Sequence, residues 1–303
     1  MKKLILEEKI QGALVGLACG DAVGTTLEFK TRGSFTPITD MVGGGPFNLA
    51  IGQWTDDTSM ALCLAHSLAH QKTFDPVDQM NRYCDWYQNG YMSSNGRCFD
   101  IGMTVSSALD TYLKTKDPFS GSTDEYSSGN GSIMRLSPIP IFYHDDYDRC
   151  IKYAGESSRT THGSDECIDS CKLFASLIFN AFHADSKAEI FETNRYMPYH
   201  ESVVAIANRD FLSLDYTQIN GSGYVVESIV SALWCFMNSD SFEECILLAA
   251  NLGNDADTTA AICGQIAGAY YGLSGIPERW RESITMGNEI EALALELFTI
   301  RKS

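Results

Sequence analysis

Two acidic clusters near opposite ends of this chain have the residue types best suited to chemistry. The first is Thr55-Asp56-Asp57-Thr58 and the second is Asp255-Ala256-Asp257-Thr258, each close to an apolar helical pattern. Carboxylates brought together in a folded protein need a counterion. The hard oxygens of Asp and Thr suit Mg²⁺, Mn²⁺ or Ca²⁺ rather than zinc. If the fold joins the clusters, the sequence predicts a binuclear divalent-metal site.

Helix capping is the alternative interpretation of each cluster. Asp and Thr are good N-caps, and each cap stabilises a helix by about 1 kcal/mol. For one cluster alone, capping is the favoured interpretation. Two clusters that share the same pattern of carboxylates and threonine favour metal binding instead.

A glycine-rich segment, residues 129–135 (Gly-Asn-Gly-Ser-Ile-Met-Arg), is a candidate phosphate site. If it leads into a helix, the unpaired N–H groups and the dipole of that helix would favour an anion. An ordinary loop-to-helix junction has the same composition, and the Gly-Lys-Ser/Thr ending of a Walker A loop is absent. Arg135 could pair with an acid or with a phosphate. The segment alone does not decide between these alternatives.

Four more residues are candidates with weaker signals. Asp21 follows a helix of small residues, and a structural role is slightly favoured for it. Glu28, in the following turn, is equally balanced between chemistry and structure. Asp100 is predicted to begin a helix, where capping is favoured. His162 follows two threonines in a predicted loop and could donate to a ligand phosphate or hydroxyl.

The elements that must position these residues are predicted to be helices. Apolar residues recur at helical spacing and strand-like alternation is nearly absent, which indicates an all-α fold. The predicted helices cover residues 7–19, 58–69, 76–88, 101–113, 133–142, 145–158, 165–184, 224–237, 242–252, 256–271 and 290–300. Residues 191–215 contain no recognisable motif, and a lid or an insertion is expected there.

Two of these helices, around residues 12–20 and 260–269, are rich in Gly and Ala. Small side chains on every face let neighbouring helices approach closely, which predicts a place at the centre of a bundle. Each helix adjoins an acidic motif. The motifs are therefore expected to emerge from the core of the bundle.

Composition limits the class of protein. The chain has 303 residues, is 44% hydrophobic and carries a net charge of −17, which argues against a nucleic-acid partner. No run approaches 18 apolar residues and the start is acidic, so neither a membrane span nor a signal peptide is expected. Ten cysteines without a CxxC pair suggest free thiols in a reducing cytoplasm. No linker divides the chain, so residues 1–303 are predicted to form a single domain.

Five motifs in this order resemble the ADP-ribosylglycohydrolase family. They are Gly20-Asp21-Ala22-Val23-Gly24, Trp54-Thr55-Asp56-Asp57-Thr58, Gly129-Asn130-Gly131-Ser132-Ile133-Met134-Arg135, Thr161-His162 and Gly253-Asn254-Asp255-Ala256-Asp257-Thr258. Two segments, Gly96-Arg97-Cys98-Phe99-Asp100-Ile101-Gly102 and Gly223-Tyr224-Val225-Val226-Glu227, look most similar to the bacterial dinitrogenase reductase-activating glycohydrolases. That branch removes ADP-ribose from arginine side chains.

The resemblance implies a compact orthogonal multi-helix bundle with two Mg²⁺ or Mn²⁺ ions in a central cleft. One ion would be bound by Thr55, Asp56, Asp57 and Asp257, and the other by Asp255, Asp257 and Thr258. The diphosphate would be bound by Asn130, Gly131 and Ser132, with His162 nearby, and Tyr224 would contact the ribose or the base.

The resemblance also supplies the candidate catalytic acids. Asp100 falls where the arginine-specific branch has an acid facing the scissile ribose. Glu28 falls where the serine-specific branch has its catalytic acid, and the sequence leaves the choice open. Asp56 is expected to take part in catalysis as well as in metal binding.

The expected function is metal-dependent hydrolysis of the N-glycosidic bond between ADP-ribose and arginine. An ADP-ribosylated protein would be the substrate and ADP-ribose the product. The alternatives are a serine (O-linked) ADP-ribose hydrolase, a two-metal phosphoesterase, and a non-catalytic immunity or ADP-ribose-binding protein. All four metal-binding acids are present, which favours activity.

Overall fold

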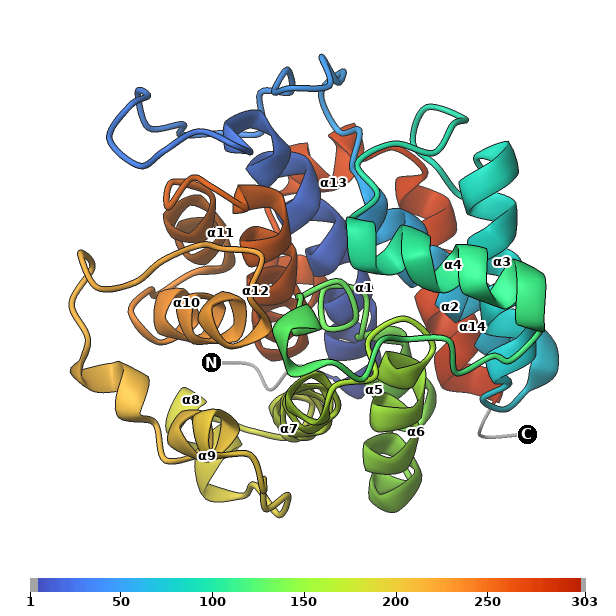
Figure 1. Ribbon diagram of the computed structural model, residues 1–303. Helices are drawn as coiled ribbons and strands as arrows, with labels where there is room; N and C mark the ends of the chain where they lie inside the picture. Colours follow the sequence, from blue (N-terminus) through green and yellow to red (C-terminus); the bar gives the residue numbers. More distant parts are fainter. Residues whose placement is uncertain (1–4, 301–303) are drawn as a thin grey trace.

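The computed structural model describes residues 5–300, and its regular elements there are helices joined by loops (Figure 1). Within that range only isolated β-bridges occur, so the all-α prediction is confirmed. The α-helices are α1 (Leu6–Gly24), α2 (Asp56–Gln71), α3 (Pro76–Asn89), α4 (Met103–Thr115), α5 (Pro138–Phe142), α6 (Tyr147–Arg159), α7 (Asp165–Ala181), α8 (Lys187–Glu192), α9 (Glu201–Ala207), α10 (Val225–Met237), α11 (Phe242–Ala250), α12 (Ala256–Tyr271), α13 (Glu278–Ser283) and α14 (Gly287–Ile300). Short 3₁₀ helices are η1 (Thr25–Leu27), η2 (Glu125–Ser127), η3 (Asp210–Ser213) and η4 (Leu273–Gly275).

Helices α1 and α12 lie side by side and antiparallel at the centre of the molecule (Figure 1). Small residues every fourth position along α1 face small residues every fourth position along α12. The facing pairs are Gly12 and Gly268, Gly16 and Gly264, Gly20 and Ala260, and Gly24 and Ala256. A Cβ added at Gly16 would lie 2.3 Å from the Gly264 carbonyl oxygen, so the two backbones are in direct contact. The predicted central position of both helices is confirmed by their near-complete burial.

This contact places the start of α12 beside the end of α1. Helix α2 begins at the same place, because hydrogen bonds join its first turn to Asp21 of α1. The two acidic clusters therefore meet at one end of the central helix pair, although most of the chain separates them in sequence.

The segment Leu6–Leu27 is long and apolar enough to cross a membrane by length and composition alone. This segment was not predicted from the sequence, because it contains no unbroken run of 18 apolar residues. In the structure, 94% of the apolar window of this segment is buried inside the molecule. This segment consists of the core helix α1, which packs on α12, and the short helix η1 that follows it.

Several helix boundaries differ from the predicted ones. The predicted helix over residues 133–142 is wrong in its first half, where turns replace it, and only α5 is helical. Pro138 and Pro140 explain this, because proline has no backbone N–H to donate into a continuing helix and is tolerated in its first turn, where α5 has both. Helix α1 continues five residues past the predicted end at Cys19, since packing on α12 overrides the weak helix propensity of Gly20 and Gly24.

We expect Gly16→Ala to destabilise the protein by about 2–3 kcal/mol, because the added methyl group overpacks the contact with Gly264. In an unconstrained helix the same change would stabilise by about 1 kcal/mol. Gly155→Ala in α6 is the matched control, since the nearest atom there is Cε at the end of the flexible Lys172 side chain. Urea unfolding of both variants checks this. Equal stabilities would contradict a tight α1–α12 contact.

Candidate active site

Asp21 of α1 caps the N-terminus of α2 from outside that helix. Its carboxylate accepts hydrogen bonds from the backbone N–H groups of Thr55 (2.8 Å) and Thr58 (3.0 Å) and from both hydroxyls (2.9 and 2.6 Å). Neither Thr55, the N-cap of α2, nor Asp255, the N-cap of α12, makes a side-chain cap bond of its own. Helix capping by their own N-cap side chains therefore does not explain the two acidic clusters, and another role is needed for their carboxylates.

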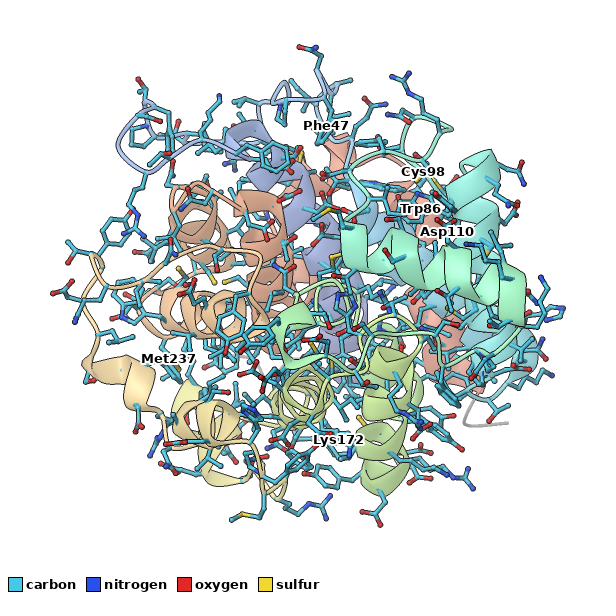
Figure 2. The ribbon with its side chains drawn as sticks, viewed as in Figure 1. Phe47, Trp86, Cys98, Asp110, Lys172 and Met237 are labelled. Atoms are coloured by element: carbon cyan, nitrogen blue, oxygen red, sulfur yellow. The ribbon has the colours of Figure 1, made fainter. Side chains whose placement is uncertain are left out.

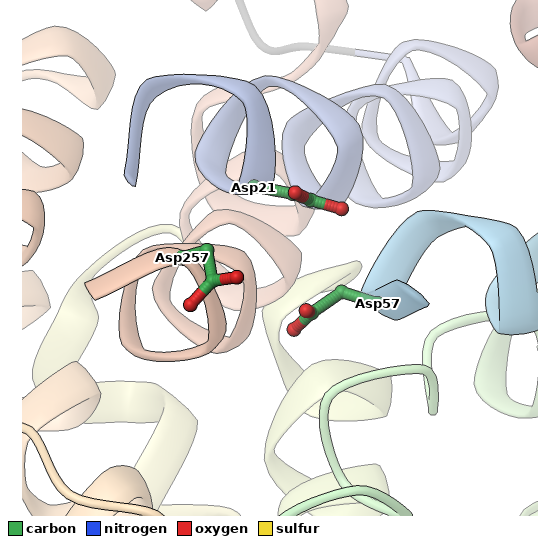
Figure 3. Close-up of side chains that lie close together, drawn as sticks. All are labelled: Asp21, Asp57 and Asp257. Carbon is green, nitrogen blue, oxygen red and sulfur yellow. The ribbon is translucent and has the colours of Figure 1, made fainter. Parts of the chain in front are cut away.

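Carboxylates from three helices converge on one point (Figure 3). One oxygen each from Asp21, Asp57 and Asp257 lie within 4.8 Å of one another. A second group, Glu28, Asp100 and Asp257, meets the same distance limit. Asp257 belongs to both groups and so lies at the centre of the acidic site.

Divalent cations fit these residues. Asp57 Oδ1, Asp257 Oδ1 and Glu28 Oε2 are buried and have no hydrogen-bond partner among the described residues. No Lys or Arg occurs among the described residues that line the adjoining cavity. Burial and repulsion from neighbouring acids raise the pKa values of Asp57 and Asp257 well above the usual range. A hard divalent ion would satisfy these oxygens and offset the repulsion.

A cavity of about 850 Å³ opens over this site. Its acidic end is lined by Glu28, Asp56, Asp100, Asp255, Asp257 and Thr258. Two predicted metal ligands, Thr55 and Asp57, are fully buried beneath that end. Thr55 Oγ1 lies 3.2 Å from both Asp57 Oδ2 and Asp257 Oδ2, so the structure does bring the two clusters together.

Asp100 does not begin a helix, contrary to the sequence prediction. Helix α4 begins at Met103 after the N-cap Gly102, and Asp100 has a left-handed backbone with φ of 62°. This conformation is unfavourable for a residue other than glycine and tends to occur at functional sites. It leaves the side chain lining the cavity instead of capping α4.

Asp100 and Glu28 are both poised to hold protons. Burial is the main cause that raises the pKa of Asp100 to about 7. Burial and then repulsion from Asp100 raise the pKa of Glu28 to about 10. Each side chain therefore favours its protonated form more than a solvent-exposed acid does, as expected of groups that transfer protons near neutral pH.

The glycine-rich segment lines the other end of the cavity through Gly129, Asn130 and Gly131. It does not lead directly into a helix, so the predicted helix-dipole contribution is wrong. Asn130 Nδ2 donates to Asp255 Oδ2 (2.7 Å) and thereby orients that acid. Ser132 is buried away from the cavity, and its hydroxyl accepts a bond from Ser158 (2.9 Å).

Arg135 and His162 support this loop from below. The buried guanidinium of Arg135 donates to the Gly131 carbonyl (2.7 Å) and to Thr161 Oγ1 (2.7 Å), and no acid among residues 5–300 forms an ion pair with it. Thr161 Oγ1 lies 2.9 Å from His162 Nδ1, an arrangement that favours a proton on Nε2. Burial, reinforced by Arg135, lowers the pKa of His162 to about 3, so the ring is neutral. A Cβ at Gly131 would lie 2.8 Å from the His162 ring, which requires glycine there.

Tyr224 lines a second cavity, of about 520 Å³, that shares Thr104, Gly129 and Gly223 with the first. Its hydroxyl donates to Glu166 Oε1 (2.6 Å). Glu166 could not be identified from the sequence, because it resembles any other acid in the first turn of a helix, here α7.

Residues 191–215 do not cover the main cavity, since none of them lines it. They include α9, which packs against α7 and α10, and η3, which packs against α9 and α10. Asp169 of α7 fixes this segment by accepting bonds from the hydroxyl of Tyr196 (2.5 Å) and the N–H of His200 (2.7 Å). This placement does not fit the expected lid over the main cavity, and the expected insertion stays a prediction.

The described residues form an all-α bundle whose buried carboxylate cluster lies beside a large cavity, and this cluster is able to bind divalent metal ions. A sequence model of the ADP-ribosylglycohydrolase family matches residues 2–303. The chain therefore belongs to the ADP-ribosylglycohydrolase family, as the motifs indicated.

Named relatives and a solved structure agree with this assignment. "ADP-ribosylarginine hydrolase Tri1" from Pseudomonas putida is 44% identical over 96% of this chain and 78% of its own length. The protein of the same name from Serratia proteamaculans is 42% identical over 96% and 79%. "ADP-ribosyl-[dinitrogen reductase] glycohydrolase" from Rhodospirillum rubrum is 31% identical over 94% and 93%. A structure titled "ADP-ribosylglycohydrolase-related protein complex" superposes with a TM-score of 0.86 at 39% identity, covering 97% of this chain and 98% of the other.

We expect millimolar Mg²⁺ or Mn²⁺ to raise the melting temperature, and to raise it more at high pH. The pKa of Asp100 is raised in the folded, metal-free protein, so its protonated side chain contributes favourably to the free energy of unfolding. This contribution is complete below the usual pKa of 3.8 and is lost as the pH rises through about 7. A saturating ion offsets that loss, by about 2.7 kcal/mol at a hundred times its Kd. Thermal scans with metal and with chelator, at about pH 5.5 and 8.5, check this. A melting-temperature shift that is absent, or that is larger at the lower pH, would contradict a metal-binding site at these carboxylates.

Asp21→Asn should destabilise the protein by about 1–3 kcal/mol, because one carboxylate oxygen becomes an amide that faces buried donors. Asp75→Asn is the control, since Asp75 caps α3 through one oxygen and Asn caps equally well. Chemical denaturation distinguishes the two. An unchanged Asp21→Asn variant would show that the cap from α1 is unimportant.

Proposed function

We propose that this protein is a metal-dependent hydrolase that removes ADP-ribose from arginine side chains of modified proteins. The observation that carries the proposal is the pair of carboxylates, Asp100 and Glu28, beside Asp257 at the acidic end of a ligand-sized cavity. The relatives named ADP-ribosylarginine hydrolase support the choice of arginine. The substrate would be an ADP-ribosylated protein and the product ADP-ribose.

The reaction adds water across the bond between ribose C1 and a guanidine nitrogen. The hydroxyl goes to C1 and the proton to the leaving nitrogen. In our proposal Asp100 faces the guanidine, because it is less buried than Glu28. A carboxylate at this place can take a proton from water or give one to nitrogen. The surrounding acids favour the positive charge that develops on the ribose.

The proposed metal ligands are Asp57 and Asp257, through their unpartnered oxygens, together with Thr55, Asp56, Asp255 and Thr258. Two ions, Mg²⁺ or Mn²⁺, suit this oxygen-only donor set. When bound, they supply Lewis-acid activation of water and a template for the ribose hydroxyls. Asn130 then acts by orienting Asp255.

The rest of ADP-ribose is proposed to extend from the acidic end along the glycine-rich segment. Gly131, Asn130 and the neutral His162 line the path for the diphosphate, and Ser132 supports the loop from behind. Tyr224 lies in the adjoining cavity, where it can contact the ribose or the base. We infer that the whole chain, 1–303, acts as a single domain. Its free cysteines, nine of ten buried, support action in a reducing cytoplasm.

Release of ADP-ribose from an arginine-modified protein, compared with a serine-modified one, tests the proposal. We expect metal-dependent release from arginine. Asp257→Asn should lower its rate by about 10²–10⁴-fold, whereas Asp110→Asn, an exposed change on α4, should not. Asp110 is labelled in Figure 2. Release from serine alone would assign the protein to the other linkage, and an active Asp257→Asn variant would reject the metal assignment.

The same assay separates the two acids. We expect Asp100→Asn to lower release from arginine by about 10²-fold or more and Glu28→Gln to lower it less. Melting temperatures of both variants, measured with Mg²⁺, control for loss of the metal site. A larger effect of Glu28→Gln would reverse the assignment of the acids.

A further inference from the structure

Phe29 is an unusually exposed aromatic residue at the acidic end of the cavity. Its side chain is 70% exposed, although it directly follows the buried Glu28. Its backbone is left-handed, with φ of 61°. Two short backbone bonds hold it there, from Phe29 N–H to the Asn254 carbonyl (2.6 Å) and from Asn254 N–H to the Lys30 carbonyl (2.7 Å). The structure thus holds an apolar ring in solvent by means of an unfavourable backbone conformation.

Folding alone does not account for this arrangement. Glycine or asparagine would adopt the left-handed backbone at lower cost, and a polar side chain would suit the exposure. Asn254 and Asp100, which also line the cavity, are left-handed as well. Such residues cluster where a binding site fixes their conformation.

Phe29 is one end of a row of aromatic rings. Its ring lies 6.4 Å from that of Phe47, and the Phe47 ring lies 5.2 Å from that of Phe99, both edge to face. Phe47 lies near the periphery of the molecule (Figure 2). Phe99 directly precedes Asp100, so the row joins the two segments that carry Glu28 and Asp100. The exposed Met103, which lines the cavity, extends the apolar surface.

We propose that Phe29, Phe47 and Phe99 form a binding surface for the arginine side chain of the modified protein and the peptide next to it. This inference rests on the proposed function. The ribose C1 must lie at the acids and the diphosphate toward Gly131, so the arginine leaves toward Phe29. An aromatic face attracts a guanidinium and packs on its methylene stem.

Charge complementarity identifies the occupant. Glu28 and Asp100 lie beside the aromatic row, and no Lys or Arg occurs among the described residues that line the cavity there. Apolar rings flanked by carboxylates suit a cation on an apolar stem, which among protein side chains favours arginine. A serine linkage would have neither the charge nor the stem, so Phe29 is a specificity-determining residue.

The experiment compares Phe29→Leu, which keeps an apolar side chain without the ring, with wild type. Steady-state kinetics on arginine-linked and serine-linked ADP-ribosyl peptides of one sequence give the first readout. We expect Phe29→Leu to lower kcat/KM for the arginine linkage by about five- to tenfold, mainly through KM. Any turnover of the serine linkage and the Kd for ADP-ribose should stay within about twofold. Phe29→Trp should restore the loss. Leu212→Ala, an exposed apolar change on η3, is the control.

A binding assay keeps this test independent of turnover. In the presence of Mg²⁺ and saturating ADP-ribose, wild type should bind an arginine peptide more tightly than the same peptide with citrulline, and Phe29→Leu should lose that preference. If Phe29→Leu keeps the preference and full arginine turnover, the aromatic surface is refuted while the proposed function stands. If wild type releases no ADP-ribose from arginine, the proposed function fails, and the peptide preference then decides for or against the surface by itself.

Discussion

The backbone contact between α1 and α12 is the constraint on which the site depends. Glycine and alanine along both helices remove the side chains that would otherwise separate them. The start of α12, with Asp255 and Asp257, is thereby fixed against the end of α1, with Asp21. Asp21 in turn fixes the start of α2 through both Thr55 and Thr58. Two acidic motifs distant in sequence become one site because three helix ends meet.

The acids at this junction have two different roles. Asp21 is fully buried, but four hydrogen bonds satisfy its charge, and it serves as a cap. Asp57 and Asp257 are equally buried, yet each has an oxygen without a partner. Burying such oxygens costs several kcal/mol unless a cation is supplied. The contrast shows that neighbouring carboxylates of similar burial can differ, since one is satisfied by hydrogen bonds and the other two keep oxygens that are able to bind a cation.

Much of the fold and site could be predicted from sequence, because the signals were local. Helical spacing, small-residue helices and paired acids of the same pattern each follow from neighbouring residues. The left-handed backbone of Asp100 could not be predicted, since no periodic sequence pattern marks a single left-handed residue. The same is true of the interaction between Tyr224 and Glu166, which joins separate helices. The shortened α5 was predictable in principle from Pro138 and Pro140, and the apolar pattern concealed it.

The most direct test of this account is anomalous diffraction from crystals grown with Mn²⁺. We expect Mn²⁺ within bonding distance, about 2.2 Å, of Asp57 Oδ1 and Asp257 Oδ1. Those two oxygens come from the two acidic motifs that the α1–α12 contact brings together. Manganese peaks elsewhere, or none at full Mn²⁺ saturation, would contradict the claim that this helix contact assembles a metal site.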